Sequence, residues 1–114
     1  MIAVLFEAWV SESGAEEYLA LASALRDELE HVEGFISVER FRSLVSPGKL
    51  LSLSFWHDEA AVERWRTQRH HRAAQAAGRS GVFIDYRLRV AAVIRDYGLD
   101  QRRDQAPADL RSAP

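Results

Sequence analysis

The hydrophobic spacing of this chain alternates along its length between the two-residue period of a strand and the three- or four-residue period of a helix, and the order of these changes restricts the fold. The order is strand, helix, strand, strand, helix, strand. Strands are expected at residues 1–10, 35–45, 49–57 and 82–96, and helices at residues 13–32 and 59–77. Two right-handed crossovers in this order predict an α+β protein of ferredoxin-like βαββαβ layout, with both helices on one face of a four-stranded antiparallel sheet.

The boundaries of these elements carry start and stop signals. Ser13 followed by Glu16 matches a capping box, which predicts the start of the first helix and stabilises it by about 1 kcal/mol. Gly34 stands where a left-handed residue would follow that helix. Asp58 is a suitable N-cap for the second helix. Residues 46–48 (SPG) predict a tight turn, so the second and third strands should form a hairpin.

Length and composition indicate one globular domain. The chain has 114 residues, of which 47% are hydrophobic and 28% charged, and the domain is expected at residues 1–98 with a polar tail at residues 99–114. The absence of cysteine excludes disulfides and thiolate chemistry. A net charge of -2 argues against nucleic-acid and anionic-membrane partners. The apolar N-terminus is too short to span a membrane and lacks signal-peptide features, so a cytoplasmic location is expected.

Large apolar residues lie on both faces of the expected sheet, although two helices can cover only one face. The richer set of each strand should face the helices, which in the third strand means Leu51, Leu53 and Phe55. The other face would then hold Leu5, Trp9, Phe41, Leu50, Trp56, Phe83 and Val93. A patch of this size is larger than a monomer usually exposes. We therefore expect a homodimer in which a second copy covers this face; the alternative is a monomer whose second face is solvated.

Five charged residues share the face expected at the dimer contact. They are Glu7, Glu39, Asp85, Arg87 and Arg89. Because buried charges need partners, we expect cross-sheet ion pairs in which Glu7 and Glu39 face Arg87 or Arg89.

Aromatic side chains are expected to line a gap between the second helix and the sheet that could accept a small aromatic molecule. They are Phe6, Phe55, Trp65 and Phe83. Three polar residues of the second helix, His71, Arg72 and Gln75, would orient such a ligand. The alternatives are ordinary core packing for Trp65 and an exposed surface position for His71.

The histidines do not suggest a metal site. His70 and His71 are adjacent, so they point about 100° apart on a helix, and residues 66–81 contain no Asp or Glu. His31 and His57 are expected to be structural or exposed. No phosphate-binding, dinucleotide-binding or serine-nucleophile motif occurs, and the RNA-recognition motif used on this fold is missing. We expect no metal and no nucleic-acid partner.

Two stretches resemble the antibiotic biosynthesis monooxygenase family: LSLSFWHDEAAVERWRTQRHHRAAQAAGR and IDYRLRVAAVIRDYG. With the earlier VEGFISVERFRS, the resemblance covers about residues 1–98 and implies a dimeric α+β barrel. It implies that Trp65 is the helix tryptophan that lines the pocket. The heme-degrading branch uses an asparagine on the first strand and a histidine on the second helical segment, where this chain has Ala8 and Gln75. The resemblance therefore disfavours heme degradation, and no cofactor is expected.

The cofactor-free branch of the family implies a reaction. A phenolic or quinol proton is removed, and the electron-rich ring then reacts directly with oxygen in a water-poor pocket. His71 would be the base and Trp65 the pocket wall. The alternative is a small-ligand-binding dimer without catalysis, because no nucleophile, base and orienting acid assemble in the sequence. A regulatory module of this fold would be expected to carry a fused partner domain.

Overall fold

The structure, a computed structural model, describes residues 1–76 and 83–100, except for the side chains at 69–76. Its elements are β1 (Ile2–Val10), α1 (Glu12–Leu29), β2 (Phe35–Arg42), β3 (Lys49–Trp56), α2 (Glu59–Ala76) and β4 (Phe83–Ala92). This order confirms the predicted βαββαβ fold. Two strands are shorter than expected, because β2 ends at Arg42 and β4 at Ala92. No helix within the described ranges is long and apolar enough to cross a lipid bilayer.

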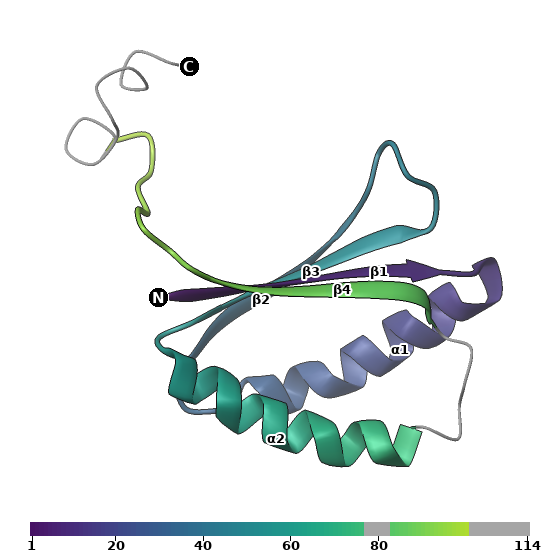
Figure 1. Ribbon diagram of the computed structural model, residues 1–114, viewed down its shortest axis with the longest axis horizontal. Helices are drawn as coiled ribbons and strands as arrows, with labels where there is room; N and C mark the ends of the chain where they lie inside the picture. The colour runs from purple at the N-terminus through teal and green to yellow at the C-terminus, as the bar shows by residue number, and fades with distance from the viewer. Residues whose placement is uncertain (77–82, 101–114) are drawn as a thin grey trace.

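The four strands form one antiparallel sheet in the order β2-β3-β1-β4. Both helices lie on the same face of this sheet, and no described element covers the other face (Figure 1). We call these the helix side and the open side. Strands β2 and β4 form the two edges of the sheet.

The pairing register corrects the predicted orientation of β3. Residues paired across antiparallel strands point to the same side of the sheet, and β3 residues Leu50 and Trp56 pair with Ala8 and Ile2 of β1. Ala8 is fully buried under the helices, so Leu50 and Trp56 also lie on the helix side. The set predicted for that side, which consists of Leu51, Leu53 and Phe55, lies on the open side instead.

Two groups of buried residues hold the helices against the sheet. The first joins the start of α1 to the middle of the sheet and contains Phe6, Ala8, Val10, Tyr18 and Leu50. The second joins the end of α1 to the start of α2 and contains Leu29, Val32, Trp56 and Ala61. Trp56 is the largest fully buried side chain, and its indole N–H donates to Ser54 Oγ at 2.9 Å, which satisfies the one polar group that it buries.

The helix starts differ in how well the sequence located them. The N-cap of α1 is Ser11, two residues before the predicted cap, because Ser11 Oγ accepts the backbone N–H of Gly14 at 3.0 Å. Ser13 was therefore the wrong cap. Asp58 caps α2 as predicted, since its Oδ1 accepts the N–H of Ala61 at 2.9 Å. Gly34 adopts the predicted left-handed conformation with φ of 90°, but it directly precedes β2 and lies four residues after the α1 C-cap, Glu30.

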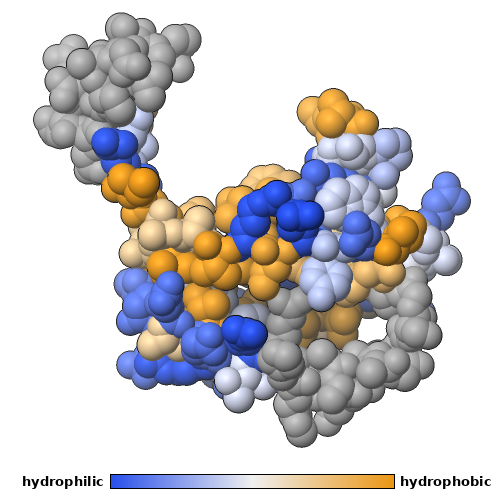
Figure 2. Space-filling view, in the orientation of Figure 1, coloured by the Kyte–Doolittle hydropathy of each residue, from blue (hydrophilic) through white to orange (hydrophobic). Residues whose placement is uncertain are grey.

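Two segments project from the open side of the sheet. One is the hairpin between β2 and β3, and the other is the chain that follows β4 (Figure 1). The hairpin tip carries Leu44 and Val45, whose side chains are almost fully exposed. Figure 2 shows apolar surface at the hairpin tip and where the second segment leaves the sheet. The open side is thus bordered at both ends by exposed apolar side chains.

Candidate functional site

A group of four aromatic rings lies on the helix side where β1 and β4 meet the start of α1. Phe83 lies 5.6 Å from Phe6 and 5.6 Å from Tyr18, in both cases edge to face. The ring of Tyr86 lies 5.6 Å from that of Phe6. Phe83 joins this side because the register shifts between Trp9 and Val10, which places it opposite Val10. The structure thus brings together two of the predicted site residues, Phe6 and Phe83.

The helix side of β4 carries exposed apolar side chains. Tyr86, Leu88 and Val90 pair with the helix-side residues Ala8, Phe6 and Val4 of β1. Their side chains are nevertheless 61%, 46% and 48% exposed. Edge strands of a ferredoxin-like sheet normally bury this face under a helix. An apolar ligand of modest size could therefore lie against β4, beside the aromatic group.

Trp65 lies on α2 and belongs to a different packing group from the four aromatic rings. It is half-buried and packs, together with Val62, against the group that contains Trp56 and Ala61. The cap at Asp58 fixes the start of α2, seven residues before Trp65. Its place agrees with core packing, and its use as a ligand wall stays a prediction.

The remaining predicted site residues divide into two cases. Phe55 pairs with Ala3 on the open side, so it does not face α2; this corrects the predicted lining. His71, Arg72 and Gln75 belong to α2, but their side chains lie outside the described residues. Their roles stay predictions.

Tyr18 and Tyr86 belong to the aromatic group, although the sequence reasoning did not assign them to the site. The sequence pattern could have indicated Tyr86, because it lies with Leu88 and Val90 on one face of β4. Tyr18 lies within the helix predicted at residues 13–32, with no signal that assigns it to the site. Its ring contact with Phe83 depends on the register shift in β1, which no sequence pattern announces.

The strongest electrostatic feature lies on the open side. Glu7 accepts from Lys49 Nζ at 2.8 Å and from Arg89 at 2.5 Å, which confirms the predicted pairing of Glu7 with an arginine of the last strand. The hydrogen bond from Lys49 has the largest effect and lowers the pKa of Glu7; burial, the next largest effect, opposes it, and the charges of Lys49 and Arg89 lower the pKa further. Lys49 also lies 4.9 Å from the ring centre of Trp9.

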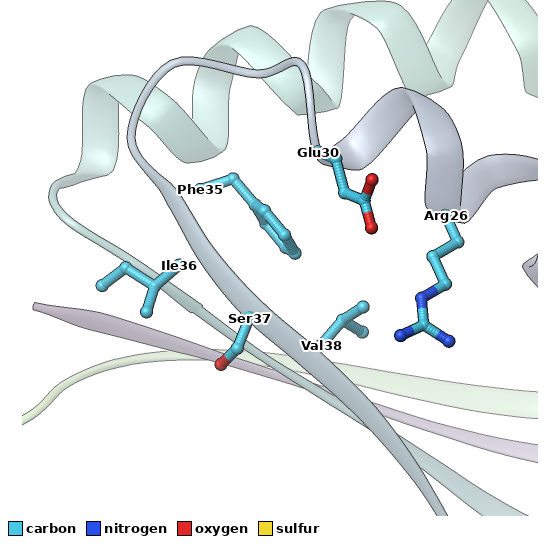
Figure 3. A pocket seen from close by; sticks show the side chains of 6 residues that line it. All are labelled: Arg26, Glu30, Phe35, Ile36, Ser37 and Val38. Atoms are coloured by element: carbon cyan, nitrogen blue, oxygen red, sulfur yellow. The ribbon is translucent and has the colours of Figure 1, made fainter.

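A hollow of about 420 Å³ lies at the opposite edge of the sheet, and it shares no residue with the predicted site. Figure 3 shows that the end of α1 and the start of β2 form its walls. Among the described side chains, no group of three or more His, Asp or Glu residues could hold a metal ion.

The fold and this surface define an α+β protein of ferredoxin-like type with an open apolar site on its sheet. The sequence profile of the antibiotic biosynthesis monooxygenase family matches residues 1–77. The chain belongs to that family. A relative from Pyricularia oryzae, named jasmonate monooxygenase ABM, is 50% identical over 93 residues, which is 82% of this chain. This chain spans 43% of that relative's length.

Solved structures agree on the fold. A candidate antibiotic biosynthesis monooxygenase from Deinococcus radiodurans superposes with a TM-score of 0.73 at 14% identity, covering 86% of this chain and 97% of that one. SnoaB, a cofactor-independent oxygenase from Streptomyces nogalater, gives 0.68 at 14% identity, covering 83% and 94%. MhuD, a heme-degrader from Mycobacterium tuberculosis, gives 0.67 at 17% identity, covering 86% and 100%. Because both kinds of oxygenase share the fold, the fold alone does not select the reaction.

Proposed function

We propose that the protein is a monooxygenase that needs no cofactor and acts on a small aromatic or quinol-type ring held against the helix side of β4. The observation that carries this proposal is the exposed apolar surface of Tyr86, Leu88 and Val90 beside the Phe6 and Phe83 rings. A flat apolar compound would cover this surface and exclude water from the reacting carbon.

The reaction on an activated ring CH₂ group balances without an external reductant. A base removes one proton, and the resulting electron-rich carbon reduces O₂ and bonds to one of its oxygens. The hydroperoxide formed on the substrate then loses water, which leaves a C=O group; the substrate thus supplies both electrons and both hydrogens of the water. The protein needs only to remove the proton and exclude solvent.

His71 is the proposed base, because it is an α2 residue with a side chain that can accept a proton near neutral pH. Trp65 would form one wall, and Arg72 and Gln75 would orient the polar atoms of the ring. Phe6 and Phe83 would contact its apolar face. Phe55 is not part of this proposal, since it lies on the open side.

Heme fits this chain poorly. The position at which the heme-degrading branch carries asparagine is Ala8, whose methyl group is fully buried among Phe6, Val10, Tyr18 and Leu50. A methyl group offers no hydrogen bond to a ligand. Gln75 stands where that branch carries histidine, and an amide is a weak iron ligand. The proposed reaction therefore uses no heme.

The proposal includes a homodimer formed through the open side. That side carries Leu5, Trp9, Leu51, Leu53, Phe55 and the exposed Phe41. Leaving each large residue in water forgoes about 1.5–3 kcal/mol, and a second sheet stacked on the first would recover much of it. A cytoplasmic location remains a prediction.

The experiment is oxygen consumption with a panel of quinols and anthrones, with products identified by mass spectrometry. We expect turnover by the wild-type protein and a loss of about 10²–10⁴-fold in His71→Ala. His70→Ala is the matched control, since it removes the neighbouring imidazole of the same helix. Turnover that survives His71→Ala unchanged removes the proposed role of this residue.

A second candidate keeps the reaction class and changes the substrate. Because the relative named jasmonate monooxygenase is 50% identical over most of this chain, jasmonate belongs in the substrate panel.

A third candidate is a dimer that binds a small ligand without reaction. Quenching of tryptophan fluorescence by a ring compound, with no oxygen uptake and no product, would favour that alternative over the enzyme.

A further inference from the structure

The helix side of β4 carries a strip of alternating residues that begins at the group of four aromatic rings. The residues of this strip are Tyr86, Leu88, Val90 and Ala92. Tyr86 is the one member whose side chain carries a polar atom. The first three side chains are between 46% and 61% exposed. Covering this strip with an apolar molecule would therefore be favourable.

The two ends of the strip differ in chemistry. At one end, the ring of Tyr86 lies 5.6 Å from that of Phe6 and 6.3 Å from that of Phe83. Because aromatic rings pack well on one another edge to face or with an offset, this end suits a ring. The other end is aliphatic in both strands and consists of Val90 and Ala92 of β4 with Val4 and Ile2 of β1. A ligand that matches both ends has a ring and an aliphatic part.

The width of the strip restricts the shape of that aliphatic part. The strip is one strand wide, because the β1 residues beside it are less exposed: Phe6, opposite Leu88, is 8% exposed, and Val4, opposite Val90, is partly buried. Neighbouring strands lie about 4.8 Å apart. This width suits a single hydrocarbon chain better than a second flat ring lying on the sheet. The aliphatic part is therefore a linear chain that follows β4.

The length of the strip sets the length of the chain. Successive residues on one face of a strand are about 6.6 Å apart, so Leu88 and Ala92 are separated by about 13 Å. An extended hydrocarbon advances about 1.25 Å per carbon, given C–C bonds of about 1.5 Å. About six carbons therefore cover Leu88 and Val90, and about ten reach Ala92, the last residue of β4.

We propose that the substrate is a ring that carries a linear aliphatic chain of about six to ten carbons, a length set by the strand spacing. The ring packs against Phe6, Phe83 and Tyr86, and the chain lies along Leu88 and Val90. The Tyr86 hydroxyl forms a hydrogen bond with an oxygen on the ring. This inference rests on the proposed function for the reaction at the ring, and it adds the class of substrate that the strip selects.

Calorimetric titration with 4-alkylphenols tests the chain in the absence of any reaction. These compounds have a ring and a hydroxyl, but they lack the activated ring CH₂ group that the proposed reaction oxidises. Affinity should rise about twofold per added carbon, which corresponds to half of the free energy of burying a CH₂ group completely, and thus about 30-fold from methyl to hexyl. Equal affinity for the methyl and hexyl compounds, or no binding of the hexyl compound, overturns the proposal.

Val90→Thr tests the position of the chain. Threonine keeps the branched shape of valine but places a hydroxyl beneath the chain, so the hexyl compound should bind about five- to tenfold more weakly, against less than twofold for the methyl compound. The matched control is Val45→Thr, the same substitution at the exposed hairpin tip, which should change neither affinity. A chain effect that survives Val90→Thr, or that Val45→Thr also reduces, overturns the proposed position.

Tyr86→Phe tests the orientation of the ligand. The variant removes the hydroxyl and keeps the ring, so it should weaken binding of the methyl and hexyl compounds by the same factor, about three- to tenfold. Tyr18→Phe is the matched control, because Tyr18 belongs to the same aromatic group but is only 6% exposed. A loss confined to the hexyl compound would place the chain at the Tyr86 end and overturn the orientation.

These titrations also separate the substrate class from the reaction. Chain-dependent binding without oxygen uptake by any quinol in the panel would refute the reaction and leave the ligand class in place. Turnover of quinols by a protein that binds 4-methylphenol and 4-hexylphenol equally would support the reaction and refute the chain.

Discussion

Glu7 connects three strands on the open side of the sheet. Its carboxylate bridges Lys49 of β3 and Arg89 of β4, and 18% of its side chain is exposed. A carboxylate held between two cations is stabilised in its ionised form, so its pKa in the folded protein lies below the ordinary value of 4.5. Ionised Glu7 therefore stabilises the fold above that ordinary value, and this stabilisation is lost as the pH falls through the lowered pKa.

We therefore expect Glu7→Gln to be less stable than the wild-type protein at pH 7, with a difference that shrinks between pH 5 and pH 3. Urea unfolding at several pH values measures this difference. Glu17→Gln is the control, since Glu17 is exposed on α1, and it should change the free energy of unfolding by about 0.5 kcal/mol at most. If the difference in free energy of unfolding between Glu7→Gln and the wild type stays constant from pH 7 to pH 3, the charge of Glu7 does not contribute to stability.

Gly34 controls how α2 meets the rest of the fold. Its φ of 90° is a conformation that residues with a Cβ rarely adopt, and a Cβ at this position would stand 2.6 Å from the Cβ of Ala61. Its carbonyl oxygen also accepts the N–H of His57 at 2.8 Å, just before α2. Close approach of the two segments therefore depends on the missing side chain.

Gly34→Ala should lower the free energy of unfolding by about 1–3 kcal/mol, through backbone strain and overpacking against Ala61. The measurement is the urea midpoint, with Gly98→Ala as the control because a Cβ there meets no atom within 4 Å. A Gly34→Ala variant as stable as Gly98→Ala would mean that the loop before β2 relaxes freely.

The third strand shows where sequence reasoning on elements stops. Its place, its direction and its hairpin with β2 followed from the SPG turn and the alternation of KLLSLSFW. The side of the sheet that each β3 residue faces did not follow, because the set that faces the helices contains Ser52 and Ser54 and is the less apolar of the two alternating sets. Packing against the helices determines which side each residue faces. Trp56 packs between α1 and α2 and is 1% exposed, and a shift of one residue in register would put Phe55 in its place.

The same limit applies to the helix start and to the candidate site. Ser13 has the capping-box partner Glu16 and Ser11 has none, yet the backbone path after β1 lets Ser11 accept the N–H of Gly14. The sequence analysis predicted Phe6 and Phe83 as site residues, but their ring contact needs the register shift at Val10. Propensity places elements well, while a single residue of register depends on contacts far apart in the chain.

At the scale of the whole molecule, the observed orientation of β3 changes which residues lie on the open side, but that side remains apolar. Trp56 leaves the open side, and Leu51, Leu53 and Phe55 take its place there. Together with Leu5 and Trp9 they form an apolar surface that no described helix covers (Figure 1). The charges that share this surface, led by Glu7, are already partly paired within one chain, so a second sheet could approach without isolating them.

Replacement of Leu53 by glutamate tests this surface. Leu53 sits at the centre of the open side, paired with Leu5 and Glu39, so a second copy would have to bury the new carboxylate without a partner. We expect a monomer by light scattering coupled to size-exclusion chromatography, against a wild-type dimer. Leu19→Glu adds the same charge to an exposed position of α1 and should leave the dimer intact, while circular dichroism checks that both variants fold. A wild-type mass of one chain at micromolar concentration would refute the dimer. A dimer that tolerates Leu53→Glu would instead place the contact elsewhere on the molecule.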